Sequence, residues 1–216
     1  MEYELLGWPP DGPTLRLDYE RFSYAGKFVM SNTGKAVART EDDEASERLD
    51  LNGDTDGERD HDVGRIVAAA AFNEDRTDDE TLWIRYVTVD RAHRGDGIGP
   101  KLLSLVRERA LKRGYDRLRI AVNNPFAYEA LYRTGFVYTG ETTGIAELLL
   151  EYPSPLELDE RSGDGVADSQ SRHKDVRFER YQAGLEEFRE RDLSEAEERF
   201  LEDRRERTPP NPRASR

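Results

Sequence analysis

The longest apolar runs of the chain lie in its middle part and have the length of β-strands. The stretches GRIVAAAAFN (64–73) and TLWIRYVTVD (81–90) are separated by the polar residues EDRTDD. Short continuous runs rich in β-branched and aromatic residues are typical of strands inside a sheet. We therefore expect two central strands joined by a polar turn.

The spacing of apolar residues becomes helical after residue 97. Five apolar residues recur on one face, and these are Ile98, Leu102, Leu105, Val106 and Ala110. This pattern predicts an amphipathic helix that ends at Gly114. The next apolar stretch, RLRIAV (117–122), predicts a strand. A strand, helix, strand order of this length implies a right-handed crossover between parallel strands.

Shorter patterns extend the predicted fold on both sides. The stretch PFAYEALYRT predicts a short helix closing at Gly135, and FVYTG and IAELLLEY predict the last strands. Near the N-terminus, TLRLDY predicts a strand, and KFVMS and KAVAR predict a hairpin with NTG at its turn. Together these elements predict an α/β fold over residues 1–153, with one mixed central β-sheet flanked by helices.

The C-terminal part of the chain has a different character. Residues 154–174 are polar and rich in turn-forming residues, which is typical of a linker. Apolar residues return at helical spacing over 175–207, where Ser194 and Glu197 match a capping box. We expect a C-terminal helical extension there, either one long helix or a hairpin, and a disordered tail over 208–216. Since such a hairpin buries little surface, it should dock on the body, on a second copy as a homodimer, or on a protein partner.

Charge is distributed unevenly along this acidic protein. The net charge is −13, and 28 of the 33 basic residues are Arg. This composition would keep a surface solvated in concentrated salt, so we expect a halophilic protein. Residues 41–62 carry eleven acidic and two basic residues and few apolar ones, which predicts a mobile loop. The charge balance argues against nucleic-acid binding, which requires a basic face.

Composition excludes several kinds of chemistry. There are no cysteines and only three histidines, so we expect no disulfide, no thiolate site and no metal. No apolar run reaches the ~18 residues of a membrane span, and the N-terminus lacks a signal-peptide pattern. We therefore expect a cytoplasmic protein without membrane contact.

Candidate chemistry gathers where the second central strand meets the amphipathic helix. The stretch VDRAHRGDGIGPKLL combines three glycines and two arginines with Pro100 in the first helical turn. Unpaired N–H groups of the glycines and of that turn would face one concavity, which suits a diphosphate. Taken alone, a simple tight turn explains the glycines equally well.

Two other phosphate-binding motifs fit this loop poorly. A P-loop has Lys and Ser or Thr after its second glycine, but Gly99 is followed by Pro100, Lys101 and Leu102. A dinucleotide fingerprint follows the first strand of a Rossmann unit, whereas several predicted strands precede this loop.

The loop and a second segment together resemble the GNAT superfamily of N-acetyltransferases. In VTVDRAHRGDGIGPKLL, the residues Arg94, Gly97 and Gly99 occupy the three defining positions of the family's Arg/Gln-x-x-Gly-x-Gly/Ala loop. The segment NNPFAYEALYRTGFVYTG resembles its second motif, an Asn followed by a short helix and a Gly-Phe pair. The resemblance covers residues 64–152. It implies a GNAT-like fold and direct transfer of an acetyl group from acetyl-CoA to a primary amine in a ternary complex.

The same resemblance assigns residues to the cosubstrate. The pyrophosphate would bind loop N–H groups, here those of Arg94, Gly95, Gly97, Ile98 and Gly99. The pantetheine arm would lie between parting strands, beside Thr88 and Val89 on one strand and residues 120–122 on the other. Asn124 would contact this arm. The 3′-phosphate could be held by Arg91, Arg94, Lys101 or Arg133.

The catalytic groups follow the family pattern less closely. The resemblance implies that the Val89 N–H stabilises the oxyanion. It also implies a Tyr acid four residues before the Gly of the Gly-Phe pair, but that position is Leu131 and Tyr132 comes one residue later. One residue rotates a helical side chain by about 100°. Tyr132 is therefore our predicted acid, with Tyr128 as the alternative.

Several alternatives remain open at this point. Glu80, His93 and Glu141 are candidates for the base, and a chain of water molecules could replace them. The acceptor amine could belong to a small molecule or a protein. The displaced Tyr and the absence of evident early helices also allow a different class of protein. This would be a non-catalytic module that binds CoA for sensing or interaction and engages a partner through residues 175–207.

Overall fold

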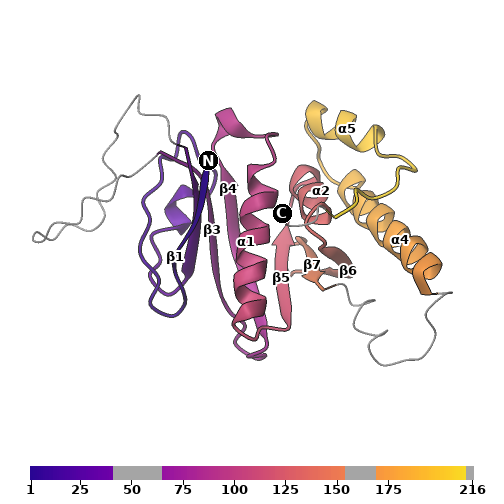
Figure 1. Cartoon of the computed structure of the whole chain (residues 1–216). Helices are drawn as coiled ribbons and strands as arrows, with labels where there is room; N and C mark the ends of the chain where they lie inside the picture. Colours follow the sequence, from indigo (N-terminus) through magenta and orange to yellow (C-terminus); the bar gives the residue numbers. More distant parts are fainter. Residues whose placement is uncertain (41–64, 154–168, 213–216) are drawn as a thin grey trace, which may run out of the picture. The chain divides into compact units, whose positions relative to one another are not determined.

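A computed structural model describes residues 1–40, 65–153 and 169–212 of the chain (Figure 1). The acidic segment 41–62 and most of the expected linker lie outside the described residues. The chain divides into two compact units, Met1–Gly114 and Tyr115–Arg216. We call them unit 1 and unit 2 and describe each by itself.

The part of unit 1 that the structure describes includes four antiparallel strands. These are β1 (Glu2–Gly7), β2 (Gly34–Arg39), β3 (Ile66–Glu74) and β4 (Thr81–Val89). Each strand pairs with the next one along the chain. The two central strands predicted from the apolar runs are confirmed as β3 and β4, because continuous apolar runs suit strands buried on both faces.

The expectations for the N-terminal segment were partly wrong. The stretches TLRLDY and KFVMS form no strand, and a short 3₁₀ helix, η1 (Ala25–Lys27), ends at the first residue of KFVMS. The hairpin partner of β2 is therefore absent, and β2 pairs with β1 and β3 instead. The strand β1 was not predicted. The backbone N–H and C=O groups of an extended segment form their hydrogen bonds with a neighbouring strand, and the local sequence pattern does not identify that strand.

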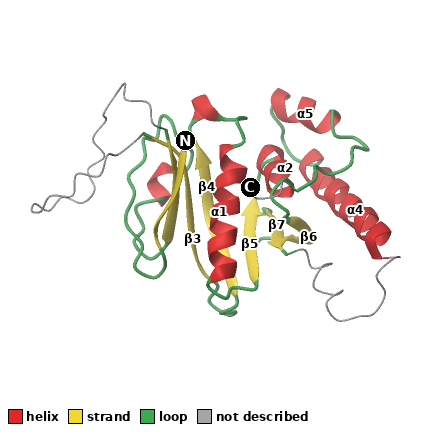
Figure 2. Cartoon of the chain, in the orientation of Figure 1, coloured by secondary structure: helices red, strands yellow, loops and turns green. Residues whose placement is uncertain are grey.

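Two layers cover the sheet of unit 1. Helix α1 (Ile98–Lys112) contacts all four strands (Figures 1 and 2). The N-terminal segment packs Leu15, Phe22 and Phe28 into a buried cluster with alternate residues of β2 and β3. Since alternate strand residues point to opposite faces, this cluster lies on the face away from α1. The carboxyl end of β4 thus meets α1 on one face and the N-terminal segment on the other.

The described residues of unit 2 include three strands, paired antiparallel, and three helices. The central strand β7 (Leu148–Tyr152) pairs with β5 (Arg117–Val122) and β6 (Val137–Thr142). Helix α2 (Pro125–Tyr132) follows β5 and begins with Asn124 as its N-cap. The strands and the short helix predicted for this segment are present.

Two helices form the C-terminal part of unit 2. They are α4 (Ser169–Arg189), which contacts β6, and α5 (Glu195–Glu202), which contacts α2. The capping box predicted at Ser194 and Glu197 is confirmed. Four of the apolar residues that suggested these helices are buried inside unit 2, namely Tyr181, Leu185, Phe188 and Leu201.

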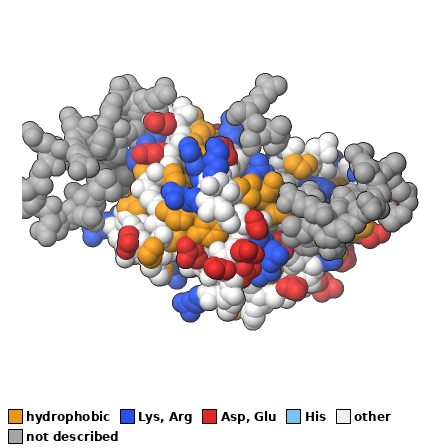
Figure 3. All heavy atoms as spheres, turned by 60° about the horizontal axis from the view of Figure 1, so that its bottom comes forward, with side chains coloured by type: hydrophobic (Ala, Val, Ile, Leu, Met, Phe, Trp, Pro, Cys, Tyr) orange, Lys and Arg blue, Asp and Glu red, His pale blue; other side chains and the backbone are white. Residues whose placement is uncertain are grey.

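The fold class predicted from the sequence is confirmed, because sheets and packed helices alternate along the chain in an α/β order. On the face shown in Figure 3, acidic and basic side chains are interspersed among the described residues. No described helix combines the length and apolarity needed to cross a bilayer. Within the described residues, no three His, Cys, Asp or Glu side chains gather as a metal site would require.

Candidate functional site

The loop between β4 and α1 is held in place at its start by a buried ion pair. Asp90 directly follows β4, and its carboxylate accepts the N–H of Ala92 and pairs with Arg21 at 2.5 Å. Burial alone would raise the pKa of Asp90, but the hydrogen bond and charge of Arg21 outweigh burial and lower it. Asp90 is therefore ionised at neutral pH and ties the loop to the N-terminal segment.

Two glycines give this loop a backbone conformation that other residues adopt only with strain. Gly95 has φ 96° and Gly97, the N-cap of α1, has φ 77°. Gly99 has a different role, because a Cβ atom there would lie 3.4 Å from Cγ2 of Val89. A larger side chain at position 99 would press against the end of β4.

The backbone N–H groups of this loop are available to a ligand. Within the described part of the chain, the N–H groups of Gly95, Gly97 and Ile98 donate to no other protein group. The first turn of α1 adds N–H groups without a helical partner and the positive end of the helix dipole. Such an arrangement of N–H groups suits a bound anion such as a diphosphate.

Cationic side chains surround the loop. Arg94 is held by bonds from Nε to the Val89 carbonyl (3.3 Å) and from Nη2 to Ser23 Oγ (3.0 Å). Arg91 and Lys101 are exposed on either side of the loop. Ser23 was missed in the sequence, because only the fold brings it to a residue 71 positions away.

Thr88 carries an unpaired hydroxyl next to this loop. Its side chain is 4% exposed, yet Oγ1 has no hydrogen-bond partner among the described residues. Buried hydroxyls are nearly always paired in proteins, so this group is suited to bond a ligand. Thr88 lies opposite Ala69 on β3, which belongs to the cluster under the N-terminal segment. Its side chain therefore points to the sheet face away from α1.

In unit 2, Asn124 is first of all a helix cap. Its side-chain oxygen accepts the N–H of Ala127 at 2.9 Å, which leaves the amide nitrogen as the group with hydrogen-bonding capacity to spare. That nitrogen lies 3.4 Å from the Asn123 side-chain oxygen. A ligand carbonyl would thus be bound through the amide N–H, because the capping bond fixes the orientation of the side chain.

Both phenols of α2 are buried beneath α4. Tyr128 and Tyr132 are fully buried, and Leu131, at the position that the family reserves for its acid, is buried as well. The ring of Tyr128 stacks on Tyr181 at 5.8 Å, and the ring of Tyr132 meets the edge of Tyr181 at 4.8 Å. The sequence indicated both phenols and the helix around Tyr181, but it did not indicate that Tyr181 packs against the two phenols.

The two hydroxyls differ in their hydrogen bonds. The Tyr128 O–H lies within reach of two carbonyl oxygens, Arg180 O at 3.0 Å and Tyr181 O at 3.2 Å. The Tyr132 oxygen accepts the N–H of Tyr138 at 3.1 Å and lies 3.3 Å from the Tyr128 hydroxyl. Apart from that hydroxyl, the described residues offer no acceptor for the Tyr132 hydrogen.

Burial raises the pKa of both phenols. For Tyr132 the hydrogen bonds from Tyr128 and Tyr138 and the charge of Arg177 oppose this rise, whereas for Tyr128 the neighbouring phenols add to it. The Arg177 guanidinium lies over the Tyr132 ring at 4.9 Å. Both phenols are therefore protonated at neutral pH, and the environment of Tyr132 is the more favourable one for a phenolate.

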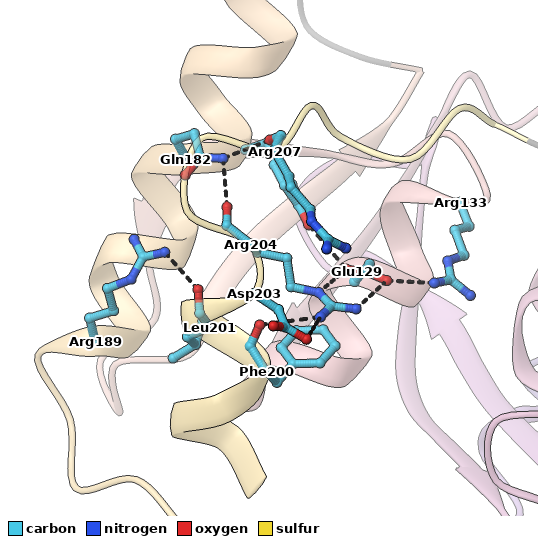
Figure 4. A network of polar contacts seen from close by, with 10 residues as sticks. Glu129, Arg133, Gln182, Arg189, Phe200, Leu201, Asp203, Arg204 and Arg207 are labelled. Atoms are coloured by element: carbon cyan, nitrogen blue, oxygen red, sulfur yellow. Dashed lines mark hydrogen bonds and ion pairs between the residues drawn. The ribbon is translucent and has the colours of Figure 1, made fainter. Parts of the chain in front are cut away.

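An ion-pair network anchors the C-terminal helices to α2 (Figure 4). Arg204 donates from Nε and Nη2 to the two carboxylate oxygens of Glu129, at 2.6 and 3.3 Å. Arg133 and the Tyr181 hydroxyl bond the same carboxylate. Burial would raise the pKa of Glu129, but the two arginines lower it. This network was not predicted from the sequence, because its members lie up to 75 positions apart.

The three candidate bases lie in different surroundings. Glu80 precedes the first residue of β4, whereas the glycine loop follows the last one. Nine strand residues separate the two ends by roughly 27 Å, so Glu80 is remote from the loop. His93 lies in the loop itself, with Nδ1 3.7 Å from an Asp96 carboxylate oxygen. Glu141 is exposed on β6.

The chain belongs to the acetyltransferase (GNAT) family, whose model matches residues 13–136. The match contains the glycine loop, Asn124 and both phenols of α2. It also includes the N-terminal segment, in which no family motif was recognised from the sequence.

Individual relatives cover different shares of the protein. An acetyltransferase of Agrobacterium fabrum is 41% identical over 59 residues, which is 27% of this chain and 43% of the relative. The chain therefore spans less than half of this curated relative. An N-acetyltransferase structure from Staphylococcus aureus is 17% identical (TM-score 0.41, 55% of this chain and 66% of that one). Nourseothricin acetyltransferase is 18% identical (TM-score 0.44, 71% of this chain and 98% of that one).

Proposed function

We propose that this protein is an acetyl-CoA-dependent N-acetyltransferase. The neutral nitrogen of a primary amine attacks the thioester carbonyl, so that a C–N bond forms and the C–S bond breaks. The amine loses one proton to a base or to water, and the departing thiolate gains one to leave as a free thiol. Both substrates are bound together, so the acetyl group moves directly between them.

The observation that carries this proposal is the backbone of the loop between β4 and α1. Its positive-φ glycines, free N–H groups and helix N-terminus form a site for a diphosphate, in a chain that belongs to an acetyltransferase family. We assign the pyrophosphate of acetyl-CoA to the N–H groups of residues 94, 95 and 97–99. Lys101 supplies additional positive charge from α1.

The remaining roles are assigned to groups at the end of β4 and on α2. The Val89 N–H would stabilise the oxyanion that forms at the thioester carbonyl. The unpaired Thr88 hydroxyl supports a further contact at this strand end, and the Asn124 amide would bind the pantetheine arm. Tyr132 would protonate the thiolate, because its hydrogen lacks a carbonyl acceptor of the kind that Tyr128 has.

Calorimetric titration with acetyl-CoA tests the cosubstrate site. Gly97→Glu and Gly99→Glu should abolish detectable binding, because a carboxylate would occupy the place of the diphosphate. Gly144→Glu is the matched control, since Gly144 is exposed and has open space around it. Unchanged affinity in both loop variants, or no binding by the wild type at millimolar ligand, would refute the assignment.

A second candidate function is supported by the complete burial of Tyr132. A phenol enclosed under α4 could serve packing alone, in a module that binds CoA without turnover and engages a partner or a second copy through residues 175–207. Release of free thiol in the presence of an amine panel separates the two functions. Sustained release with any amine excludes the non-catalytic module, whereas binding without release to any amine excludes the transferase.

A further inference from the structure

A hollow of about 600 Å³ lies beside the glycine loop, entirely within unit 1. Its wall combines aromatic and cationic side chains, namely Tyr19, Phe22, Tyr24, Lys27 and Arg91, with Ser23 between them. No acidic side chain of the described residues lines it. The hollow is therefore cationic and partly apolar, which is unusual on a chain whose net charge is −13.

The two cations of the hollow are not used within the protein. Among the described residues, Lys27 and Arg91 form no ion pair, although most other arginines near them do. Arg21 and Arg65, for example, both pair with Asp90. Two unpaired cations at one concave site attract an anion more strongly than either would alone on a convex surface.

The aromatic part of the wall carries a strained residue. Tyr24 has φ 60°, a left-handed conformation that a bulky side chain rarely adopts, and its side chain is 49% exposed. Tyr19 is 78% exposed. The Tyr24 ring lies beside the Tyr86 ring, with 6.0 Å between their centroids, and half of the residue remains exposed. Strain combined with exposed aromatic surface is common where a ligand binds.

The hollow is fixed to the acetyl-CoA loop. The Arg91 N–H donates to the Arg21 carbonyl at 3.1 Å, and Arg94 bonds Ser23 at 3.0 Å. The hollow is formed by the N-terminal segment, which covers the sheet face away from α1. The loop N–H groups belong to α1 and the turn before it. A ligand in the hollow would thus approach the carboxyl end of β4 from the side opposite to α1.

We infer that this hollow binds the acceptor, and that the acceptor is a primary amine bearing a carboxylate and an apolar or aromatic body, such as an amino acid. In direct transfer the nucleophile approaches the reacting carbon from a side that the cosubstrate leaves free. Lys27 and Arg91 bind the carboxylate, and the rings of Tyr19 and Tyr24 pack on the body. The Thr88 hydroxyl lies on the same sheet face but does not line the hollow. This inference rests on the proposed transferase function.

Pairs of acceptors that differ only in the carboxylate test the inference. Free thiol release is measured with L-phenylalanine against L-phenylalaninamide, and with L-leucine against L-leucinamide, in the presence of acetyl-CoA. A charge-assisted contact is worth about tenfold or more in affinity. The wild type should therefore use each acid at least about tenfold better in kcat/KM than its amide.

Variants of the two cations locate the effect. Lys27→Gln should raise KM for the acid by about tenfold and reduce the preference for acid over amide, while KM for acetyl-CoA stays within about twofold. Arg91→Gln should reduce the preference for acid over amide in the same way. Arg76→Gln is the matched control, because Arg76 is an exposed cation in the turn before β4. This control should retain the wild-type preference.

Replacing Tyr24 by glycine tests the role of the ring without adding backbone strain. Tyr24→Gly removes the ring and relieves the positive φ, so the melting temperature should change little, whereas KM for the acid should rise. Tyr24→Phe keeps the ring and should retain the wild-type KM.

The outcomes separate the inference from the function on which it rests. Thiol release with amides but not with acids overturns the inference and leaves the transferase intact. An increase in KM for acetyl-CoA in the Arg91 and Lys27 variants, with unchanged acceptor preference, also overturns it, because the hollow would then bind part of the cosubstrate. No release with any amine, despite calorimetric binding of acetyl-CoA, contradicts the proposed function itself.

Discussion

The two units differ in whether the polar groups near their family motifs are bonded within the protein. In unit 1, the loop N–H groups, the Thr88 hydroxyl and the cations Lys27 and Arg91 have no partner among the described residues. In unit 2, the carboxylate of Glu129 and the hydroxyls of Tyr128 and Tyr181 are bonded within the unit. Unit 1 thus offers groups to ligands, whereas unit 2 uses its groups for its own stability.

This difference shows where a motif can be interpreted directly. The glycine loop functions through its backbone, so its residue types alone indicate an anion site. The second motif lies under a C-terminal extension that satisfies most of its polar atoms. Its residue types therefore reflect both packing and chemistry, and substitutions at single residues separate the two roles. The Tyr132 hydrogen is the main exception, because it has no carbonyl acceptor.

The largest effect is expected from the ion-pair network of unit 2. Arg204→Met keeps an apolar contact on the Phe200 ring but removes both bonds to Glu129. The free energy of unfolding should fall by about 3 kcal/mol, because a nearly buried carboxylate loses its main partner. Denaturant unfolding measures this loss, and Arg199→Met, which removes an exposed ion pair, should cost less than about 1 kcal/mol.

The double variant and the pH dependence test the same network. With Glu129→Gln added, Arg204→Met should be markedly less harmful, and strict additivity would contradict the charge argument. The pKa of Glu129 is lower when folded, so its contribution is present above the ordinary carboxyl pKa. That contribution disappears as the pH falls through the folded pKa. The difference between Arg204→Met and the wild type should therefore shrink under acidic conditions.

The next largest effect concerns the one phenol of unit 2 that could serve chemistry. Tyr132→Phe should lower kcat by about a hundredfold with little change in KM for acetyl-CoA, as expected for loss of a general acid. The basic limb of the pH–rate profile should disappear in this variant. Tyr128→Phe is the matched control and should lower kcat by less than about threefold. Equal activities of the two variants would show that Tyr132 serves packing. Both phenols of α2 would then contribute to stability and not to chemistry.

The sequence predicted those elements whose pattern is local. The strands β3, β4 and β5 and the helix α1 were identified from apolar runs or helical spacing within single segments. The N-terminal segment was misread, because residues 14–19 alternate like a strand but have no neighbouring strand to pair with. Its actual partners are side chains on β2 and β3, which no local pattern indicates.

The candidate site was predictable to the same extent. The loop residues Arg94, Gly97 and Gly99 were named from the sequence, since a backbone anion site depends on contiguous residues. Bonds such as that between Arg94 and Ser23 join distant segments, and so does the packing of Tyr181 on Tyr132. These contacts decide which groups remain free for a ligand, and they follow only from the fold.

Close packing of α4 on α2 should produce a smaller effect. A Cβ atom at Gly184 would lie 2.1 Å from the Tyr128 hydroxyl, so Gly184→Ala should destabilise the protein by about 2 kcal/mol, despite the higher helix propensity of Ala. Thermal or denaturant unfolding measures the change. Tyr128→Phe in the same chain removes the oxygen but leaves ring atoms Cζ and Cε2 at 2.5 and 2.8 Å from the added Cβ, so it should recover only part of the loss. Gly144→Ala, in open space, should be nearly neutral. A stable Gly184→Ala protein would mean that α4 does not pack on α2 this closely.

The smallest effect concerns a cationic side chain of unit 1 that is buried and hydrogen-bonded within the unit, unlike Lys27 and Arg91. Lys35 is fully buried on β2, and its ammonium donates to the carbonyls of Met30 (2.7 Å) and Thr33 (2.9 Å). Burial lowers its pKa from 10.5 to about 8. Between these values the unfolded chain binds a proton that the folded chain does not, so stability should rise with pH in this window.

Lys35→Met removes this titration and leaves the rest of unit 1 intact. The stability of the wild type relative to the variant should therefore increase by about 1 kcal/mol between pH 9 and pH 10, in denaturant unfolding at fixed ionic strength. Lys112→Met, at an exposed site on α1, should follow the wild-type pH dependence. Parallel curves for the wild type and Lys35→Met would show that the carbonyl bonds keep Lys35 charged. Unit 1 would then contain a buried cation held by two backbone carbonyls and the Thr33 hydroxyl, whereas the buried carboxylate of Glu129 in unit 2 is held by two arginines.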